Sequence, residues 1–290
     1  VMEELWKYYV LDHVYKVDHF TVPGETQGCL EYNIKCGGKG VNQAIAMALA
    51  GNDTYFAGII GSDGGLLKDA LVDKGVHIDY MKISNKPTGH AIIEVDQSGQ
   101  NHILLYGTNK EIDFEYIDEV LSHFSKGDIV VLQNEINNVP YIIERCYEKE
   151  MKIFFNAAPY DIAVKNYPIE KVTWLVVNET EGAALSNEED YEKIIETLKQ
   201  KYPHTHILFT MGKEGSRVLT DKEDIKVEAL KVNAVDTTGA GDTYIGYFVR
   251  GIVEEMPLLE TAQMATKASA IAVTRFGAVD AIPNYEEVFE

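Results

Sequence analysis

Short apolar runs alternate with longer stretches of helical character in the second half of this chain. Four of these runs are rich in β-branched and aromatic residues, and they span residues 129–132, 153–155, 174–177 and 207–209. Continuous apolar runs of this length are typical of strands that are buried on both faces of a parallel sheet. The pattern therefore predicts an α/β fold with a mostly parallel central sheet flanked by helices.

Polar residues follow each of the four runs, at positions 133–135, 156, 178–181 and 210. In open α/β sheets, ligands bind outside the carboxyl ends of the strands, where such side chains would meet. A single polar ending can simply mark the point where a strand leaves the core. Four such endings in one sheet favour a shared ligand-binding edge.

The first third of the chain follows a different pattern, in which polar and apolar residues alternate as they do in half-exposed strands. Residues 31–36 and 90–95 have this alternation, and a turn-rich link joins the second of them to the run 102–106. That arrangement predicts a β-hairpin. We expect the strands within residues 12–36 and 86–106 to form a small accessory sheet, which would serve as a lid beside the ligand edge.

Composition and charge narrow the classes of partner. No repeat, Pro-rich linker or low-complexity tract divides the chain, so we expect one folding unit over residues 1–290. A formal net charge of −20 argues against binding to nucleic acid or to an anionic membrane surface, because either partner would be repelled. A local site for a phosphorylated ligand stays open if backbone amides, helix N-termini, metal ions or a few lysines form it.

The cysteines and the first residues of the chain indicate the cellular compartment of the protein. Cys29, Cys36 and Cys146 form no CxxC pair and are too few and too scattered for a disulfide framework. Acidic residues precede any apolar run at the start, so we expect no secretory signal, and no apolar run has the length of a membrane helix. These features predict a soluble cytoplasmic protein.

A glycine-rich segment at 37–44 joins the first alternating strand to a predicted amphipathic helix. Glycines before a helix let a ligand approach the backbone closely, and Lys39 and Asn42 add polar groups at the same place. A tight turn alone is the simpler interpretation. Three glycines together with a lysine and an asparagine exceed what a turn requires, so we favour a ligand-binding segment.

A second glycine-rich segment, residues 236–243, precedes another predicted helix. The backbone N–H groups of Gly239, Ala240 and Gly241 would point from the helix N-terminus toward an anion, assisted by the helix dipole. A carboxylate beside a phosphate is repulsive unless it takes part in the chemistry, and Asp242 could accept a proton from an attacking hydroxyl. The alternative for Asp242 is an acid that the helix dipole stabilises.

Three other phosphate-binding patterns are missing from the sequence. There is no GxxxxGK[ST] segment, no GxGxxG segment, and neither of the HRD and DFG motifs. A P-loop enzyme, a dinucleotide-dependent oxidoreductase and a protein kinase therefore each lose their main support.

The two glycine-rich segments, in this order and about 200 residues apart, resemble those of the PfkB (ribokinase-like) carbohydrate kinases. Other segments fit the same family. Residues 23–26 resemble its early lid segment, 178–181 its NxxE motif, 210–215 its nucleotide loop and 274–278 its C-terminal segment. The resemblance covers almost the whole chain.

This resemblance implies a Rossmann-like α/β core with a β lid. It also implies an enzyme that moves the γ-phosphoryl group of ATP to a hydroxyl of a small sugar, ribose- or fructose-like. Asp242 would be the base that takes the proton from that hydroxyl. The amides of Gly239, Ala240 and Gly241 would form the anion hole for charge on the transferred group.

The resemblance also implies roles for binding residues. Asn178, Thr210, Gly212 and Gly215 would border the nucleotide, and Glu181 would help to hold Mg²⁺, largely through water. The positions that match the sugar site are Asp12, Gly38, Lys39, Asn42 and Glu135. A site for a monovalent cation such as K⁺ is implied at Asp236 and the carbonyls of Thr238, Ala272 and Gly277.

Some alternatives and departures stay open at this point. Asp12 could equally be a turn acid, and Glu135 could be a solvated strand end. Residues 7–11 precede Asp12 where the family places an apolar strand, and Ala281 stands where relatives have a serine ligand for the cation. The bulkier Tyr247 replaces a smaller residue of the family and is interpreted as a packing change.

Alternatives for the function also stay open, and the resemblance bears on the oligomeric state. A nucleoside kinase of the same fold is one, and a non-catalytic relative that binds sugar or nucleotide is another, although the intact Asp242 argues against the latter. Lid strands often carry dimer contacts in this family, so the resemblance implies a homodimer through the lid.

Overall fold

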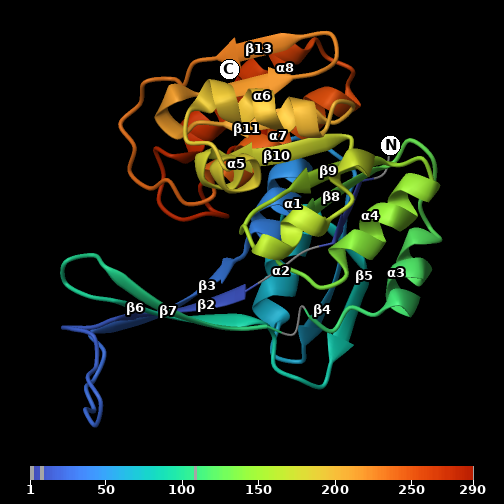
Figure 1. Ribbon diagram of the computed structural model, residues 1–290. Helices are drawn as coiled ribbons and strands as arrows, with labels where there is room; N and C mark the ends of the chain where they lie inside the picture. Colours follow the sequence, from blue (N-terminus) through green and yellow to red (C-terminus); the bar gives the residue numbers. More distant parts are fainter. Residues whose placement is uncertain (1–2, 7–9, 108–109, 290) are drawn as a thin grey trace.

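The computed structural model describes residues 3–6, 10–107 and 110–289 of the chain. A nine-stranded sheet runs through the centre of the molecule (Figure 1). Its strands lie in the order β13 (Asp224–Val227), β12 (Ser216–Leu219), β11 (His206–Thr210), β10 (Trp174–Asn178), β9 (Lys152–Asn156), β8 (Ile129–Gln133), β1 (Glu3–Trp6), β4 (Thr54–Gly61) and β5 (His77–Ser84). Neighbours from β11 to β5 run parallel, whereas β12 and β13 are antiparallel. The prediction of a mostly parallel α/β sheet is confirmed.

The four predicted core strands are β8, β9, β10 and β11, and both of their faces are buried. In β8, Ile129 and Val131 belong to one hydrophobic core, whereas Val130 and Leu132 belong to a second core across the sheet. The same alternation continues in the next three strands, because successive side chains of a strand point to opposite faces. This two-sided burial is the physical reason for the continuous apolar runs in the sequence.

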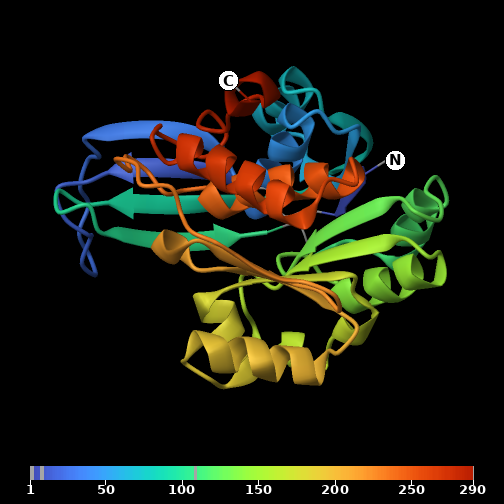
Figure 2. The same ribbon diagram turned by 90° about the horizontal axis from the view of Figure 1, so that it is seen from above.

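Helices cover both faces of the sheet (Figure 2). The first core is shared with α1 (Lys39–Leu49), α2 (Gly65–Asp73), α7 (Ala240–Val253), α8 (Leu258–Ala272) and α9 (Tyr285–Phe289). The second is shared with α3 (Phe114–Leu121), α4 (Val139–Glu148), α5 (Glu179–Ser186) and α6 (Tyr191–Lys201). Short 3₁₀ turns span Ile162–Asn166, Ile169–Lys171 and Gly212–Glu214. None of the helices in the described ranges has the length and apolar character needed to cross a membrane.

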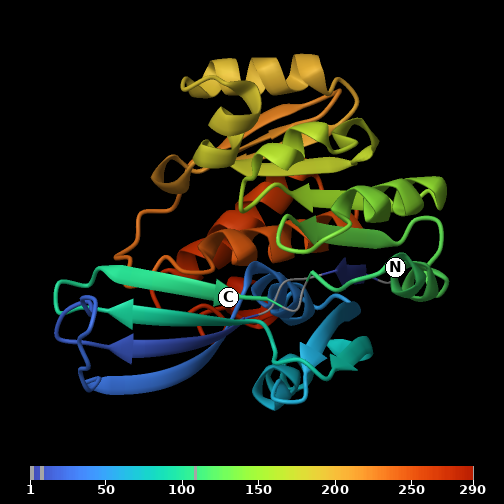
Figure 3. The ribbon, with the colours of Figure 1, turned by 60° about the horizontal axis from the view of Figure 1, so that its bottom comes forward.

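The alternating segments form a separate four-stranded sheet that projects from one side of the body (Figure 3). Its order is β3 (Glu31–Gly37), β2 (Val10–Lys16), β6 (His90–Val95) and β7 (Asn101–Tyr106). β6 and β7 pair antiparallel, which confirms the predicted hairpin. We call this four-stranded sheet the lid.

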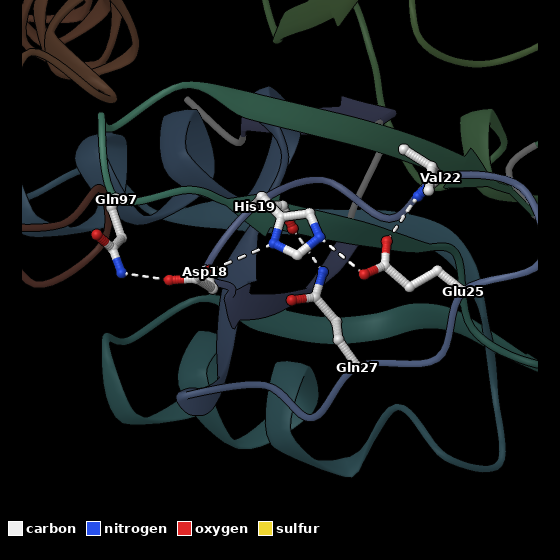
Figure 4. Close-up of polar contacts among 6 residues, drawn as sticks. All are labelled: Asp18, His19, Val22, Glu25, Gln27 and Gln97. Atoms are coloured by element: carbon white, nitrogen blue, oxygen red, sulfur yellow. Dashed lines mark hydrogen bonds and ion pairs between the residues drawn. The ribbon is translucent and has the colours of Figure 1, made fainter.

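The outer ends of the two lid connections are tied together by polar contacts (Figure 4). Gln97, from the turn between β6 and β7, donates a hydrogen bond of 2.6 Å to Asp18, which follows β2. His19 lies between Asp18 and Glu25, and the hydrogen bond to Glu25 is the main cause that raises the pKa of this imidazole. Glu25 also accepts a hydrogen bond from the backbone N–H of Val22, so it orders the segment that resembles the early lid segment of the family.

A strand forms near the N-terminus even though the sequence before Asp12 departs from the family pattern. β1 lies between β8 and β4 and runs parallel to both. Residues 7–9 of the unusual segment lie outside the described residues. Tyr247 is fully buried and donates a hydrogen bond of 2.8 Å to the carbonyl of Pro283, in agreement with its interpretation as a packing change.

Candidate active site

The two glycine-rich segments meet where α1 and α7 begin. These helices approach closely because Gly246 carries no side chain: a Cβ there would lie 2.4 Å from the Cβ of Ala46. Asn42 and Asp242, which are 200 positions apart in the chain, are joined by a hydrogen bond of 2.9 Å. The fold therefore brings the two motifs into one site.

Both carboxylate oxygens of Asp242 accept hydrogen bonds from side-chain amides. Asn42 Nδ2 donates to Oδ2 at 2.9 Å, and Gln43 Nε2 donates to Oδ1 at 2.8 Å. Asp242 lies in the first turn of α7 and is 7% exposed. The helix dipole favours a negative charge at this place, but two donors on the same carboxylate also fix its orientation.

A cavity of about 200 Å³ opens beside this carboxylate. Eight residues that the sequence singled out line it: Lys39, Asn178, Glu181, Thr210, Gly239, Ala240, Gly241 and Asp242. Five further lining residues had no assigned role: Asn156, Ala158, Val176, Thr237 and Ile245. Position 156 was one of the four polar endings that predicted the ligand edge, and Asn156 does line the cavity, whereas the apolar lining residues carry no signal of this kind.

The turn before α7 is shaped so that a ligand can approach its backbone. Gly239 has φ = 75°, a left-handed conformation that favours glycine, and α7 begins at the next residue. A Cβ on Gly241 would meet no atom within 4 Å, so the space beside this first helical turn is open. Backbone N–H groups in the first turn of a helix have no intrahelical partner, and together with the dipole they suit an anion.

Glu135 follows β8 and lies partly buried near the start of α1. The backbone N–H of Lys39 donates a hydrogen bond to its carboxylate. Burial raises the pKa of Glu135 to about 8 against the attraction of Lys39, and the charges of Asp242 and Asp12 raise it further. Glu135 is therefore not a solvated strand end, because the charges of Lys39, Asp242 and Asp12 all act on its carboxyl group.

Asp12 lies within β2, so its interpretation as a turn acid is wrong. Its carboxylate covers Gly37, where a Cβ would lie 2.1 Å from Asp12 Oδ2. Burial raises the pKa of Asp12 to about 6, against the opposing charge of Lys35, its neighbour across the sheet. The glycine at position 37 is needed for this close approach.

Asn42 Oδ1 and Glu135 Oε2 are two of the buried oxygen atoms that lack a hydrogen-bond partner within the described residues. Buried polar atoms are normally paired, and one left unpaired costs free energy. Hydroxyl groups of a polyol could donate to Asn42 Oδ1, and they could donate to Glu135 or accept from its protonated carboxyl. This side of the site therefore has the chemistry that a sugar requires.

Asn178 and Glu181 form a capping box at the start of α5. Asn178 Oδ1 accepts from the backbone N–H groups of Thr180 and Glu181, while Glu181 Oε2 accepts from the N–H of Asn178 at 2.9 Å. Glu181 is 6% exposed and still lines the cavity. The amide nitrogen of Asn178 and the second carboxylate oxygen of Glu181 are the polar atoms that this box leaves for a ligand.

Nothing in the described ranges forms a group of three or more His, Cys, Asp or Glu side chains able to hold a metal ion. Mg²⁺ commonly binds through one or two carboxylates together with water and substrate phosphates. The remaining oxygen of Glu181 fits that kind of coordination.

The predicted nucleotide loop is a tight turn between β11 and β12. Thr210 lines the cavity, but Gly212 and Gly215 do not belong to its lining residues. Gly215 has φ = 100°, and a Cβ there would lie 2.0 Å from the carbonyl oxygen of Val227 in β13. The structure thus gives Gly215 a packing reason as well, and its role in nucleotide binding stays a prediction.

Asp236, Thr238 and Gly277 lie together beside this site. Asp236 Oδ1 accepts from the backbone N–H and the hydroxyl of Thr238, and Oδ2 accepts from the N–H of Gly277 at 3.0 Å. Partial burial raises the pKa of Asp236, but these hydrogen bonds outweigh it and the net pKa is lowered. The carbonyl of Ala272 accepts from the N–H of Arg275, and Ala281 is buried without a side-chain oxygen. Both oxygens of Asp236 thus already accept from donors of the chain, and the site for a monovalent cation stays a prediction.

A second hollow, of about 280 Å³, lies between β13 and α8. Its lining residues are Lys226, Val227, Glu228, Leu230, Leu259, Gln263 and Thr266. No sequence motif points to this hollow, because its residues come from elements that are distant in the chain.

Comparison with known proteins agrees with this geometry. Residues 7–284 match the family model described as pfkB family carbohydrate kinase. The chain belongs to the pfkB family of carbohydrate kinases. It is therefore an enzyme of the class that phosphorylates sugar hydroxyls, as the two glycine-rich segments had indicated.

Curated and solved pfkB relatives match along nearly their whole length. The ribokinase of Haemophilus influenzae is 31% identical over 290 residues, which cover 96% of this chain and 94% of that protein. The Arabidopsis thaliana ribokinase, solved with ribose and ATP, has a TM-score of 0.90 at 27% identity and covers 99% and 97% of the two chains. The Cryptococcus neoformans ribokinase, solved with ADP, has a TM-score of 0.88 at 26% identity and covers 99% and 98%. The predicted ribokinase-like fold is confirmed.

Proposed function

We propose that this pfkB enzyme transfers the γ-phosphoryl group of ATP to a hydroxyl of a small ribose- or fructose-like sugar, with Asp242 as the base. The observation that carries the proposal is the buried Asp242 carboxylate, fixed by two amides at the start of α7 and facing a cavity. The similar proteins bear names that favour ribose: one is a ribokinase solved with ribose and ATP. ATP is the phosphoryl donor on the same grounds.

In the proposed reaction Asp242 accepts the proton of the attacking sugar hydroxyl. The N–H groups of Gly239, Ala240 and Gly241 receive the negative charge of the transferred phosphoryl group, in the place where the helix dipole also favours it. Donors that are held in place by the fold need little reorganisation during the reaction. The N–H of Ala240 also donates a long hydrogen bond of 3.3 Å to the carbonyl of Thr237, which it would exchange for the phosphoryl oxygen. Mg²⁺, when bound, would neutralise charge on the phosphates, and Glu181 would help to hold it through water.

The sugar would lie on the side of Asp242 where the two unpaired acceptor atoms are. Its hydroxyls would contact Asp12, Asn42 and Glu135, and the backbone of Gly38 would let the sugar approach the start of α1. Lys39 lines the cavity next to Glu135, so its charge can serve the sugar, the phosphate or both. Acids and amides can bridge neighbouring hydroxyls, which suits a polyol.

The nucleotide would occupy the other side of the cavity. Asn178 and Thr210 line it there, and Gly212 and Gly215 shape the adjoining turn. We place the base of the nucleotide in the hollow between β13 and α8, whose mixture of apolar and amide side chains suits a purine. A monovalent cation such as K⁺ would be held by Asp236 and by the carbonyls of Thr238, Ala272 and Gly277.

We also propose that residues 1–290 act as a single kinase domain whose lid covers the sugar and joins two copies into a homodimer. The support is a row of exposed apolar side chains on the lid, among them Ile34, Ile92, Leu104 and Tyr106. Contiguous exposed apolar surface commonly marks an interaction site. A reducing, cytoplasmic compartment fits the exposed thiol of Cys29, in the connection between β2 and β3.

A panel of sugars and nucleosides, assayed by ATP-dependent ADP release, tests the substrate class. We expect turnover of ribose or of a similar free sugar. Turnover of adenosine without any free sugar would make the enzyme a nucleoside kinase. Complete inactivity together with nucleotide binding would favour a non-catalytic relative.

Asp242→Asn tests the base. We expect kcat to fall by at least about 100-fold while ATP binding is retained, because the amide cannot accept the proton. Asp73→Asn, which changes an exposed acid at the end of α2, is the matched control and should leave kcat unchanged. If Asp242→Asn keeps full turnover, Asp242 is not the base.

A further inference from the structure

Two buried glutamines lie next to Asp242. Gln43 belongs to the first glycine-rich segment and Gln133 to one of the polar strand endings, but neither had an individual role in the sequence analysis. Gln43, in α1, is 0% exposed, and Gln133, the last residue of β8, is 1% exposed. Glutamine is seldom fully buried, so a buried pair next to a reactive carboxylate calls for a physical reason. The hydrogen bonds of the pair supply one.

The two side chains form a chain of amides that ends on Asp242. Gln133 Nε2 donates to Gln43 Oε1 at 2.6 Å, and Gln43 Nε2 donates to Asp242 Oδ1 at 2.8 Å. An ionised carboxylate only accepts hydrogen bonds, so the NH₂ group of Gln43 must face Asp242. Its oxygen then faces Gln133, whose own NH₂ group must point toward it. The chemistry thus fixes the direction of both amides.

The two oxygens of Asp242 have different surroundings. Oδ2 accepts from Asn42, whose own oxygen is left unpaired on the sugar side of the site. Oδ1 accepts from the fully buried Gln43. The oxygen that can meet the sugar hydroxyl is therefore Oδ2, and Oδ1 serves to hold the carboxylate in its orientation.

We propose that Gln43, itself held by Gln133, is a positioning residue that sets the plane of the Asp242 carboxylate for proton transfer. The inference rests on the proposed role of Asp242 as the base. A neutral donor suits this task, because it orients the carboxylate without neutralising its charge as a lysine or an arginine would. Small errors in the position of a reacting group are costly: a displacement of about 1 Å can lower a rate by about 100-fold.

A purely structural role explains the pair less well. Gln133 Oε1 is buried and has no hydrogen-bond partner within the described residues. This unsatisfied acceptor lowers the stability of the folded protein. Two apolar side chains of similar shape would avoid that cost. Residues that are unfavourable for stability occur mainly at functional sites. A functional role fits this pair, because its amide chain ends on the proposed base.

Gln43→Leu tests the proposal, because it keeps most of the volume and removes the donor. At saturating sugar and ATP we expect kcat to fall by about 10- to 100-fold, with both KM values within about 2-fold of the parent. Gln133→Leu leaves Gln43 in place but frees its orientation, so we expect a smaller loss of about 3- to 10-fold. A kcat within about 2-fold of the parent in a folded Gln43→Leu protein overturns the proposal.

The controls separate positioning from stability. Asn52→Ala removes another buried amide, just beyond the far end of α1, and should lower the melting temperature without changing kcat. If Gln43→Leu does not fold, Gln133→Leu decides, and an unchanged kcat there contradicts the amide chain. If Asp242→Asn is inactive while both glutamine variants are fully active, only this inference fails and the proposed base stands.

Discussion

At the scale of single residues, the site depends on carboxyl groups that the fold keeps close together despite their mutual repulsion. The charges of Asp242 and Asp12 both act on Glu135, and Lys39 is the cation that offsets part of their repulsion there. Burial is the first cause of the raised pKa values of Glu135 and Asp12. Protonation of Glu135 below its raised pKa relieves the repulsion between these carboxyl groups.

The raised pKa of Glu135 has a consequence for stability. Its pKa rises from 4.5 in the unfolded reference to about 8 in the folded protein, so the folded state binds more protons between these values. Stability contributed by this group is therefore present at low pH and is lost as pH rises through the interval. Glu135→Gln removes the titration. We therefore expect the difference in melting temperature, variant minus parent, to be larger at pH 9 than at pH 5.

The measurement for Glu135→Gln is thermal unfolding of both proteins at the two pH values. Glu111→Gln, which changes an acid outside this cluster, is the control and should leave the pH trend of the parent intact. A difference between Glu135→Gln and the parent that is the same at pH 5 and pH 9 would contradict the raised pKa.

At the scale of elements, the site depends on how closely α1 and α7 pack. The donors Asn42 and Gln43 belong to α1, whereas Asp242 belongs to α7, so any separation of the helices lengthens both hydrogen bonds. Gly246 is the residue that permits the close approach. The geometry of the proposed base is thus set by packing one turn further along the helix.

Gly246→Ala tests this dependence. The new Cβ would lie 2.4 Å from the Cβ of Ala46 and close to the backbone of α1, so the helices must move apart. We expect a loss of about 1–3 kcal/mol in the free energy of unfolding and a lower kcat. Denaturant unfolding and steady-state kinetics measure the two effects.

Gly65→Ala is the matched control for Gly246→Ala. Gly65 is the first residue of α2, and a Cβ there would meet no atom within 4 Å. Alanine favours the helix over glycine by up to about 1 kcal/mol, so this variant should be as stable as the parent or more stable. Equal behaviour of the two variants would show that α1 and α7 tolerate a wider spacing.

At the scale of the whole molecule, the lid links substrate binding to the proposed assembly. Asp12 stands on one face of the lid, while His13 and its cross-strand neighbours Ile34 and Ile92 stand on the other. Ile92 in turn lies opposite Leu104, which is 61% exposed. One face of the lid thus carries Asp12, a residue of the proposed sugar site, and the other presents apolar side chains that a second copy could cover.

Leu104→Glu tests the homodimer. A charge in the middle of an apolar interface is costly when it loses water, so we expect the variant to sediment as a monomer where the parent sediments as a dimer. Ile83→Glu changes a side chain that is 68% exposed on the edge strand β5, and it should leave the dimer intact. A parent protein that is monomeric at micromolar concentration would contradict the proposed assembly.

Much of this architecture could be predicted from local sequence patterns. Strands buried on both faces leave continuous apolar runs, half-exposed lid strands leave alternation, and glycines before helices mark the turns that bind ligands. The lid hairpin and the four core strands followed from these patterns. β1 was not readable in the same way, because its short sequence carries two acids and its place between β8 and β4 comes from pairing with distant strands.

The sequence by itself determined the fold class, the family and the candidate base, because each is encoded in residues that are neighbours along the chain. Only the tertiary structure decided what surrounds that base. Gln43 belongs to the first glycine-rich segment and Gln133 to a polar strand ending, but nothing in the sequence connects the two, because they are 90 positions apart. Their hydrogen bonds to each other and to Asp242 form only because α1, α7 and β8 pack together in the folded protein. A local pattern of polar and apolar residues cannot predict contacts between elements that are far apart in the chain.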